Sequence, residues 1–329
     1  MVDLSIIIPH YNSISTLTKL LNSIPVKENI EIIVIDDRST KDLDRLRYIY
    51  SSKKFKHVTF LENRNPNKGA GVCRNIGLDH SSGNWILFAD ADDFFVENFY
   101  KNISKYFNSN YDVVFFKPTS IELDTLNKSD RHIRYETLLL NYSNINNIEN
   151  ETRLRYQYYV PWSKLINKSI LIKNDILFDE VIASNDVMFS TKLGYFMNEF
   201  EISHDVIYCV TRGTGTLTTN TNMDVFESRI DTHIRYCEFL KQNLEKKEYK
   251  ILRPNGLGIL FNAFKLKLGF NKIISILFQL KKSKVAIFDI KILNPFYIIR
   301  RLRHHNKNHS NKSKYFVDDT NKSKHYNIY

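Results

Sequence analysis

A short apolar run leads directly into three closely spaced carboxylates in the stretch WILFADADD, residues 85–93. The run Trp85–Ala89 is typical of a buried strand. Asp90, Asp92 and Asp93 follow at its carboxyl end, where they repel one another and resist burial unless a cation or donor groups compensate them. Mg²⁺ and Mn²⁺ prefer such oxygen ligands. Taken alone, the stretch fits two interpretations equally well: a metal–diphosphate site at a strand end, and an acidic turn with a helix cap at Asp92 or Asp93.

The first 120 residues alternate strand and helix patterns, which predicts an α/β fold with a mostly parallel central sheet. Strands are expected at 4–8, 30–35, 58–62, 85–89 and 113–117, and helices at 13–24, 41–51, 69–78 and 96–107. Three of these strands end in polar or acidic clusters, which begin at Pro9, Asp36 and Asp90. Ligands bind beyond the carboxyl ends of the strands in open α/β sheets. The agreement of three strand ends therefore favours the binding-site interpretation.

The rest of the chain is divided by composition. Residues 120–160 are polar and Asn-rich, and are interpreted as an insertion or linker with a helix near 134–141. A helix is expected over 225–250 and apolar-basic helices over 256–303. The predicted organisation is a donor-binding half at 1–120, an acceptor-binding half of the same domain at 121–220, a helical C-terminal region at 221–304, and a basic disordered tail at 305–329.

The charge is distributed unevenly along the chain. Residues 241–329 contain 20 Lys or Arg and 5 Asp or Glu, whereas residues 1–240 contain 27 and 31. A basic region can meet nucleic acid, an anionic membrane or a polyanionic substrate. No nucleic-acid recognition module is present, so no specific nucleic-acid partner is expected. The two interpretations kept for the basic region are attachment to an anionic membrane surface and a packed helical subdomain with a solvated basic exterior.

The cysteines and the N-terminus bear on the cellular compartment. The three cysteines are far apart in the sequence and form no CxxC pair, which favours a reducing, cytosolic setting. The first residues read as a strand rather than a signal peptide, and no stretch approaches the roughly 20 apolar residues that span a bilayer. A cytoplasmic protein is therefore expected.

Six motifs follow one another between residues 3 and 220. They are SIIIPHYN at 5–12, IVIDDRS at 33–39, NKGAGVCRNIG at 67–77, GNWILFADADD at 83–93, WSKL at 162–165 and SNDVMF at 184–189. In this order and spacing they resemble the inverting glycosyltransferases of family 2, of the bacterial O-antigen and capsule type. The resemblance implies the GT-A fold, which binds a nucleotide-sugar.

The resemblance also implies roles for residues of the donor half. Pro9, Tyr11 and Asp37 would line the uridine pocket, Arg74 and Arg212 would contact the diphosphate, and Asp90 would bind the ribose. Asp92, assisted by Asp93, would hold Mn²⁺ or Mg²⁺. The residues alone leave alternatives open. Tyr11 can instead close the core at a strand end, and Arg74 can be a surface residue that pairs with Asp79.

In the acceptor half, the resemblance makes Asp186 the base that deprotonates the acceptor hydroxyl. The family usually has Glu-Asp at this point, and this chain has Asn185-Asp186, which leaves the geometry of acceptor binding open. Asn185 and Trp162 are nevertheless expected on the acceptor side. Two alternatives remain: Asp186 can cap the following helix, and Trp162 can be a buried packing residue.

The function implied by the resemblance is metal-dependent, inverting transfer of a hexose or N-acetylhexosamine from a UDP-sugar. The expected acceptor is a saccharide linked to undecaprenyl diphosphate, at the cytoplasmic face of the bacterial inner membrane. A catalytically silent scaffold or partner-binding protein with the same fold is the alternative, because a fold does not guarantee activity.

Overall fold

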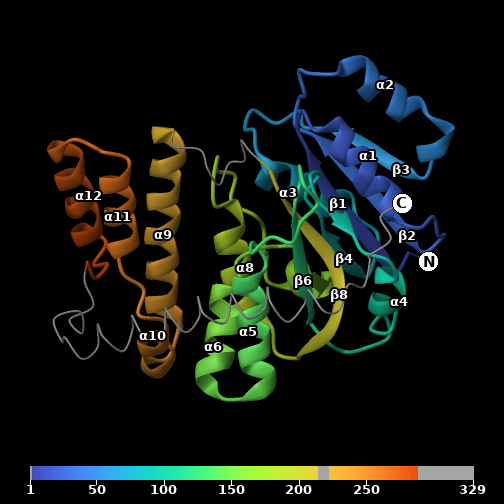
Figure 1. Cartoon of the computed structure of the whole chain (residues 1–329). Helices are drawn as coiled ribbons and strands as arrows, with labels where there is room; N and C mark the ends of the chain where they lie inside the picture. The colour runs from blue at the N-terminus through green and yellow to red at the C-terminus, as the bar shows by residue number, and fades with distance from the viewer. Residues whose placement is uncertain (1, 214–221, 288–329) are drawn as a thin grey trace. The chain divides into compact units, whose positions relative to one another are not determined.

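The computed structural model describes residues 2–213 and 222–287 and divides the chain into two compact units, Met1–Leu252 and Arg253–Tyr329 (Figure 1). The first part of unit 1 alternates strands and helices, as the sequence predicts. Its elements are β1 Leu4–His10, α1 Ile14–Ser23, β2 Ile30–Asp36, α2 Leu43–Ser51, the 3₁₀ turn Lys53–Phe55, β3 Val58–Glu62, α3 Ala70–His80, β4 Trp85–Phe88, β5 Phe94–Phe95 and α4 Phe99–Ser104. The helix predicted over 96–107 is shorter than expected, and no helix begins at Asp92 or Asp93, which removes the helix-cap interpretation.

The strands form one eight-stranded sheet in the order β3-β2-β1-β4-β7-β6-β8-β5. Strands β3, β2, β1 and β4 are mutually parallel. Strand β7 (Lys164–Asn167) runs antiparallel to both β4 and β6 (Val113–Glu122), and β6 pairs in parallel with β8 (Phe200–Arg212). The predicted α/β fold is confirmed. The four strands β3, β2, β1 and β4 form the parallel part of the sheet. The remaining strands include both parallel and antiparallel pairs.

The central strands are buried on both faces, which explains their continuous apolar sequence. Every residue of β1 and β4 is buried. Pro9 lies inside β1 although it has no N–H to donate. The β1–β4 ladder ends at Ile7 and Phe88, so on the β4 side Pro9 already lies beyond the paired residues. In the register of β1 with β2, His10 lies opposite Asp36, which brings the polar ends of these strands together.

The stretch interpreted as an insertion or linker is instead regular structure. Strand β6 continues to Glu122, five residues past its predicted end, because it pairs with β8 along its whole length. Two helices follow, α5 Ile133–Asn144 and α6 Ile148–Gln157, and they pack against each other (Figure 1). Helices α7 Lys168–Lys173 and α8 Asn185–Phe196 come next. The helix predicted near 134–141 is confirmed as α5, and the Asn-rich composition with its weak apolar periodicity concealed only α6.

The C-terminal helices fall into both units. Helices α9 Met223–Asn243 and α10 Lys246–Leu252 belong to unit 1, where α9 packs on α8 and α10 on α6. Unit 2 contains α11 Leu257–Lys265 and α12 Phe270–Lys282. Within residues 2–213 and 222–287, no helix combines the length and apolarity needed to cross a bilayer. The predicted tail at 305–329 lies outside the described residues.

All three cysteines, Cys73, Cys209 and Cys237, are buried and free. Burial raises the pKa of each thiol to about 12.

Candidate functional site

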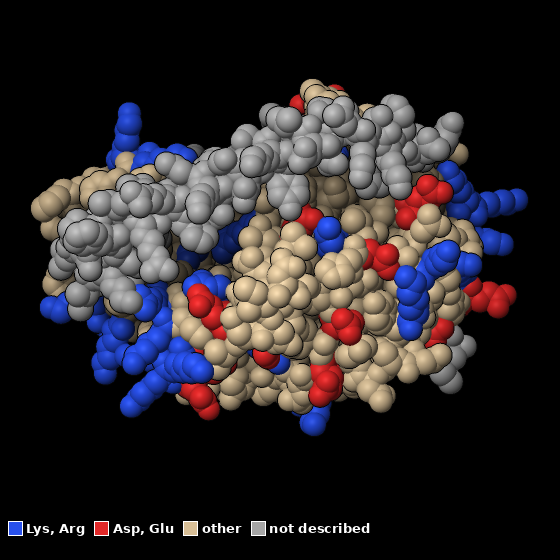
Figure 2. All heavy atoms as spheres, turned by 60° about the horizontal axis from the view of Figure 1, so that its bottom comes forward, with Lys and Arg blue, Asp and Glu red and all other residues tan. Residues whose placement is uncertain are grey.

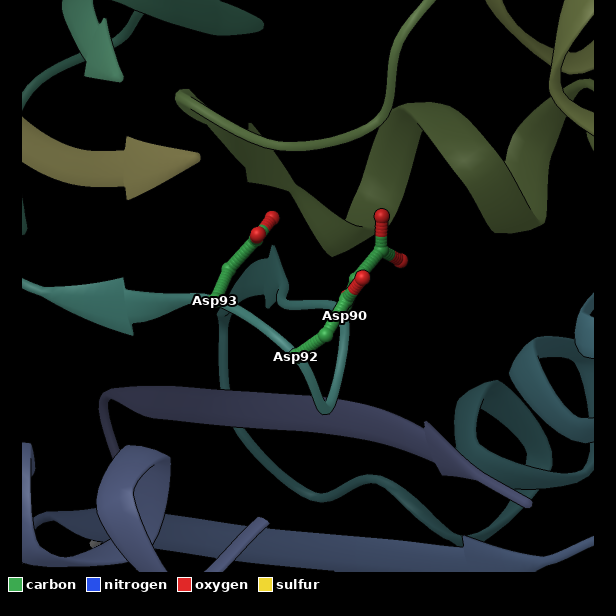
Figure 3. A group of neighbouring side chains, drawn as sticks. All are labelled: Asp90, Asp92 and Asp93. Atoms are coloured by element: carbon green, nitrogen blue, oxygen red, sulfur yellow. The ribbon is translucent and has the colours of Figure 1, made fainter. Parts of the chain in front are cut away.

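The three carboxylates of the opening stretch lie on one turn at the end of β4. Asp90, Asp92 and Asp93 each place a carboxylate oxygen within 4.8 Å of the others, and their side chains extend to the same side of the turn (Figure 3). The turn is fixed by a hydrogen bond from Asp93 N–H to Asp90 C=O, at 3.0 Å. The three carboxylates therefore converge, as ligands of one cation would.

The end of β8 closes around this carboxylate turn. Thr211 N–H donates to Asp93 Oδ1 at 2.7 Å, and the Thr211 hydroxyl donates to the backbone carbonyl of Asp92 at 2.7 Å. Asp90 N–H donates to the buried Tyr208 hydroxyl at 2.8 Å. The turn is therefore held by a strand that lies almost 120 residues further along the chain.

The residues of this turn fit a divalent cation. Burial and the neighbouring Asp90 raise the pKa of Asp92, and burial with Asp92 and Asp90 raises that of Asp93. The second oxygen of Asp93, Oδ2, is buried without a hydrogen-bond partner among the described residues. A buried carboxylate oxygen without a donor is costly, and a hard cation ligated by this oxygen and Asp92 would relieve both the missing partner and the mutual repulsion.

Arg74 of α3 links this turn to α8. Its Nη2 lies 2.5 Å from Asp90 Oδ1 and its Nη1 donates to Asn185 Oδ1 at 2.8 Å. The side chain is buried and its guanidinium stacks over the Phe178 ring. The alternative of a surface arginine paired with Asp79 is thus wrong, because burial in the first turns of α3 turns the side chain away from Asp79. Both terminal nitrogens already have a carbonyl or carboxylate partner. Arg74 therefore bridges Asp90 of the carboxylate turn and Asn185 of α8.

The bridge depends on a close approach of α3 to the loop before α8. A Cβ on Gly71 would lie 2.2 Å from the Asp179 carbonyl oxygen and 2.9 Å from the Asn185 Cβ. Only glycine therefore fits at this position, and the glycine turn predicted to open α3 also brings α3 against the start of α8.

The ends of β1 and β2 form a second polar cluster. Asp37 accepts from the buried Asn63 amide at 2.6 Å and from Gly69 N–H at 2.8 Å. Gly69 has a φ of 126°, which favours glycine, so Asp37 fixes a turn that most other residues would strain. Asp37 is only 7% exposed. Asn63 was not predicted from sequence, because a lone asparagine at a strand end has no distinctive pattern.

His10 and Asp36 support the same edge of the sheet. His10 Nδ1 lies 2.9 Å from Asp36 Oδ1, and Ser39 donates to the same carboxylate. Burial alone would raise the pKa of Asp36, but the hydrogen bonds from His10 and Ser39 outweigh it and leave this pKa below its usual value. The charged carboxylate is thereby stabilised as a fixed part of the cluster.

Tyr11 is 51% exposed, with Lys68 Nζ 5.5 Å from its ring centre. The alternative that it closes the core is therefore wrong. Pro9 is buried within β1 opposite Ile35 of β2, and Tyr11 follows the last residue of β1. Their assignment to a uridine pocket stays a prediction. An exposed ring of this kind offers a flat surface to a base.

Asp186 lies in the first turn of α8, directly after the Asn185 that accepts from Arg74. Burial raises its pKa, with Arg74 and Lys164 opposing and Asp90 adding to the rise. The cap residue of α8 is Ser184, and no side-chain hydrogen bond caps this helix. Capping therefore does not account for Asp186, whose carboxylate is left for another role.

Lys164 lies behind α8 and was not predicted as a site residue. Its Nζ donates to the Tyr158 carbonyl at 2.7 Å and to the Ser190 hydroxyl at 3.2 Å. Ser190 is one helical turn from Asp186. Burial lowers the pKa of Lys164 to about 7, while the charge of Asp186 acts in the opposite direction. The lysine of the WSKL motif is thus an internal support for the helix that carries Asp186.

Two predicted residues occupy other surroundings. Trp162 is 3% exposed and packs against Tyr135, Tyr158 and Tyr208, so the packing alternative describes it and an aromatic wall for an acceptor does not. Arg212 forms an ion pair with Asp130 at 2.9 Å, rather than a contact with the carboxylate turn.

Two further arginines, Arg131 and Arg134, come from the segment interpreted as a linker, and Arg131 reaches the site. Arg131 Nη1 donates to the Thr211 carbonyl at 2.6 Å. Its positive charge opposes the rise in the pKa of Asp92 and Asp93 that burial causes. Arg134 is exposed and lies over the Tyr159 ring, at 5.3 Å from its centre. Neither belongs to a recognisable motif, so only the tertiary structure reveals them.

Comparison with known proteins places this geometry in context. The family model described as glycosyl transferase family 2 matches residues 5–173, just over half of the chain. The chain is 28% identical over 215 residues to the poly(ribitol-phosphate) beta-N-acetylglucosaminyltransferase TarS of Staphylococcus aureus strain Mu50. That match covers 63% of this chain and 35% of the relative, so the chain spans about a third of the length of this curated relative.

Two solved structures are similar in fold. The crystal structure of S. aureus TarS residues 1–349 in complex with UDP-GlcNAc matches with a TM-score of 0.63 at 22% identity, covering 85% of this chain and 81% of the other. The mannosyltransferase PcManGT of Pyrobaculum calidifontis, in complex with GDP-Man and Mn²⁺, matches with a TM-score of 0.51 at 14% identity, covering 85% and 75%. Both matches support the GT-A fold.

Proposed function

Because the chain belongs to glycosyl transferase family 2, we propose that it transfers a hexose or N-acetylhexosamine from a UDP-sugar to a saccharide acceptor, with inversion at the anomeric carbon. The observation that carries this proposal is the Arg74 bridge, which joins Asp90 of the carboxylate turn to Asn185, the neighbour of Asp186. A diphosphate-binding edge and a candidate base are thereby held in one site. The UDP-GlcNAc bound to TarS supports the choice of donor.

On the donor side, Tyr11 and Pro9 would contact the uracil ring, and Asp37 would hold the turn at Gly69 and offer its remaining acceptor capacity to the base. Asp90 would accept from the ribose hydroxyls while it retains Arg74. Arg212 would contact the diphosphate once it leaves Asp130; its chain neighbour Thr211 already binds Asp92 and Asp93.

Asp92 and Asp93 would hold Mn²⁺ or Mg²⁺, and the unpartnered oxygen Asp93 Oδ2 supports this assignment. When bound, the cation would stabilise the negative charge of the departing UDP as a Lewis acid. The Mn²⁺ bound with GDP-Man in PcManGT is consistent with such a site.

Asp186 would accept the proton of the acceptor hydroxyl. As the acceptor oxygen forms its bond to the anomeric carbon, the bond from that carbon to the UDP oxygen breaks, and the proton passes to the Asp186 carboxylate. A pKa raised by burial makes this carboxylate a stronger base than an exposed aspartate. Asn185 and Arg74 would keep it oriented.

We propose a lipid-linked saccharide of surface-polysaccharide synthesis, carried on undecaprenyl diphosphate, as the acceptor. The exposed Arg134 over Tyr159 supports an acceptor that combines a sugar ring with phosphate, because the aromatic ring can pack against the sugar and the guanidinium can bind the phosphate. The poly(ribitol-phosphate) in the name of TarS is likewise a polymer that contains phosphate.

Calorimetric titration with UDP tests the donor site directly. The full-length protein is expected to bind UDP in Mn²⁺ and to lose most of this affinity in EDTA. Asp92→Ala should abolish the metal-dependent part, whereas Asp79→Ala, a matched change of an exposed aspartate on α3, should leave it intact. Absence of UDP binding by a folded sample would instead favour the silent scaffold.

A further inference from the structure

Helix α12 has two separate apolar faces. One face buries Ile276 and Leu280. The other carries Phe270, Ile274 and Phe278, which follow one another at i, i+4 and i+8 and therefore form one stripe along the helix. All three are exposed, the two phenylalanines by 70% or more. We call these three residues the α12 stripe.

Helix α11 repeats this arrangement. It buries Ile259, Leu260 and Ala263, and leaves Phe261 and Phe264 exposed. The two helices together expose four phenylalanines, between 63% and 76% each, within 18 residues. Single exposed apolar residues are normal on a protein surface, but a dense set of large ones marks an interaction site.

The helical pair has a core without these side chains. Helices α11 and α12 pack on each other, and Gly256 N–H donates to the Ala286 carbonyl at 2.8 Å, which closes the pair. A Cβ on Gly256 would lie 2.5 Å from a Leu280 methyl group, so Leu280 fills the space against the backbone there. The exposed phenylalanines are thus not needed to hold α11 to α12.

The charge around the exposed phenylalanines has one sign. Residues 253–287 contain seven Lys or Arg and no Asp or Glu. Lys265 and Lys267 lie at the end of α11, and Lys281, Lys282 and Lys284 at the end of α12, all exposed. Figure 2 shows Lys and Arg in blue gathered toward the left of the described surface, whereas the rest of that face carries both signs.

We propose that the α12 stripe, together with Phe261 and Phe264, inserts into the interface of an anionic phospholipid bilayer, with the neighbouring lysines at the lipid headgroups. Aromatic and aliphatic side chains on one face and lysines beside them are the composition of interfacial helices. A second copy of the chain is a poorer occupant, since it would bring like charges together.

The proposal rests on the proposed function in one respect: a lipid-linked acceptor places the reaction at a membrane surface. Binding to lipid and binding to UDP are nevertheless separate measurements. Failure of one would leave the other result standing, so the two proposals can be judged independently.

Vesicle cosedimentation of the full-length protein tests the proposal. The protein is expected to bind vesicles of phosphatidylglycerol and phosphatidylethanolamine, and to bind phosphatidylcholine vesicles much less. The double variant F270S/F278S should weaken binding to the anionic vesicles by about tenfold or more, because each change removes a large apolar side chain from the interface. Lys281→Gln with Lys282→Gln should weaken it about fivefold or more, and added salt should remove that difference.

The control is Tyr48→Ser, which removes an equally exposed aromatic side chain from α2 of unit 1 and should leave lipid binding unchanged. Circular dichroism and thermal melting of every variant verify the fold. The proposal is overturned if the wild-type protein does not bind anionic vesicles. It is equally overturned if the double variants F270S/F278S and F261S/F264S both bind these vesicles as tightly as the wild type does. It is also overturned if the wild type self-associates in solution and F270S/F278S abolishes that association without changing lipid binding.

Discussion

The two walls of the site are held in different ways. We name the two walls after the function proposed above. The donor wall is the ends of β1, β2 and β4, namely His10 and Tyr11, Asp36 and Asp37, and Asp90 to Asp93. The acceptor wall is the first turn of α8, with Asn185 and Asp186, and Lys164 behind it. The donor wall follows from the order of neighbouring parallel strands, whereas the acceptor wall is fixed by contacts such as Arg74 to Asn185, 111 residues apart in sequence. A strand-end site can thus be inferred from local patterns, and its catalytic partner depends on the complete fold.

The largest expected effect is that of Asp186→Asn, which should disturb the acceptor wall and leave the donor wall intact. Asp186→Asn should lower turnover by about 10²–10⁴, because the acceptor hydroxyl loses its base, while UDP affinity stays at the wild-type level. Turnover with a UDP-sugar and UDP titration measure the two walls separately. An equal loss of UDP binding would assign Asp186 to the donor wall and remove the distinction.

The same variant should be more stable than the wild type near neutral pH. Burial raises the folded-state pKa of Asp186 above its unfolded value of 3.8, so the ionised carboxylate costs free energy once the pH exceeds that value. Asparagine removes this cost. A thermal midpoint that rises with Asp186→Asn would agree with this sign, and a lower midpoint would contradict it.

Arg74→Lys tests the bridge between the walls. Lysine keeps the charge but cannot reach Asp90 and Asn185 together. A hydrogen bond to a charged group contributes about 1.5–3 kcal/mol. Because Arg74→Lys loses one such bond, we expect kcat/KM to fall by about 10- to 100-fold. The matched variant Asn185→Ala disturbs only the acceptor wall, so it should lower kcat less and leave UDP affinity unchanged. Equal UDP affinity in Arg74→Lys and the wild type would show that the donor wall does not need the bridge.

Lys164→Met tests the support behind the acceptor wall, and of these variants it is expected to change turnover least. The folded-state pKa of Lys164 is about 7, against a usual value of 10.5. As the pH rises, the folded protein therefore loses this proton before the unfolded chain does. The stability of the wild type should therefore rise between these two pH values, relative to Lys164→Met. Thermal midpoints of both proteins across that range measure the difference. Parallel curves would mean that Lys164 titrates near its usual pKa and stays charged at neutral pH.

The predictability of the two walls differs for physical reasons. The strands, the carboxylate turn and the glycine turn at Gly69 follow from short apolar runs and turn residues, which act locally. The length of β6, helix α6 and the approach of Arg131 depend on pairing with β8 and packing between helices. The sequence alone left two interpretations of Trp162, and only the structure decides that it is buried. The role of Lys164 is similarly invisible, since burial of a lysine has no local signature.

The buried thiols make the chain convenient for site-directed labelling. Cys73, Cys209 and Cys237 are the only cysteines of the sequence, and with pKa values of about 12 almost none of each is the reactive thiolate at neutral pH. A cysteine introduced at an exposed position, such as Ser275 on α12, would react with a maleimide dye far faster than the native three. An environment-sensitive fluorophore or a spin label at this position could therefore test whether α12 enters a lipid interface, without first removing any native cysteine.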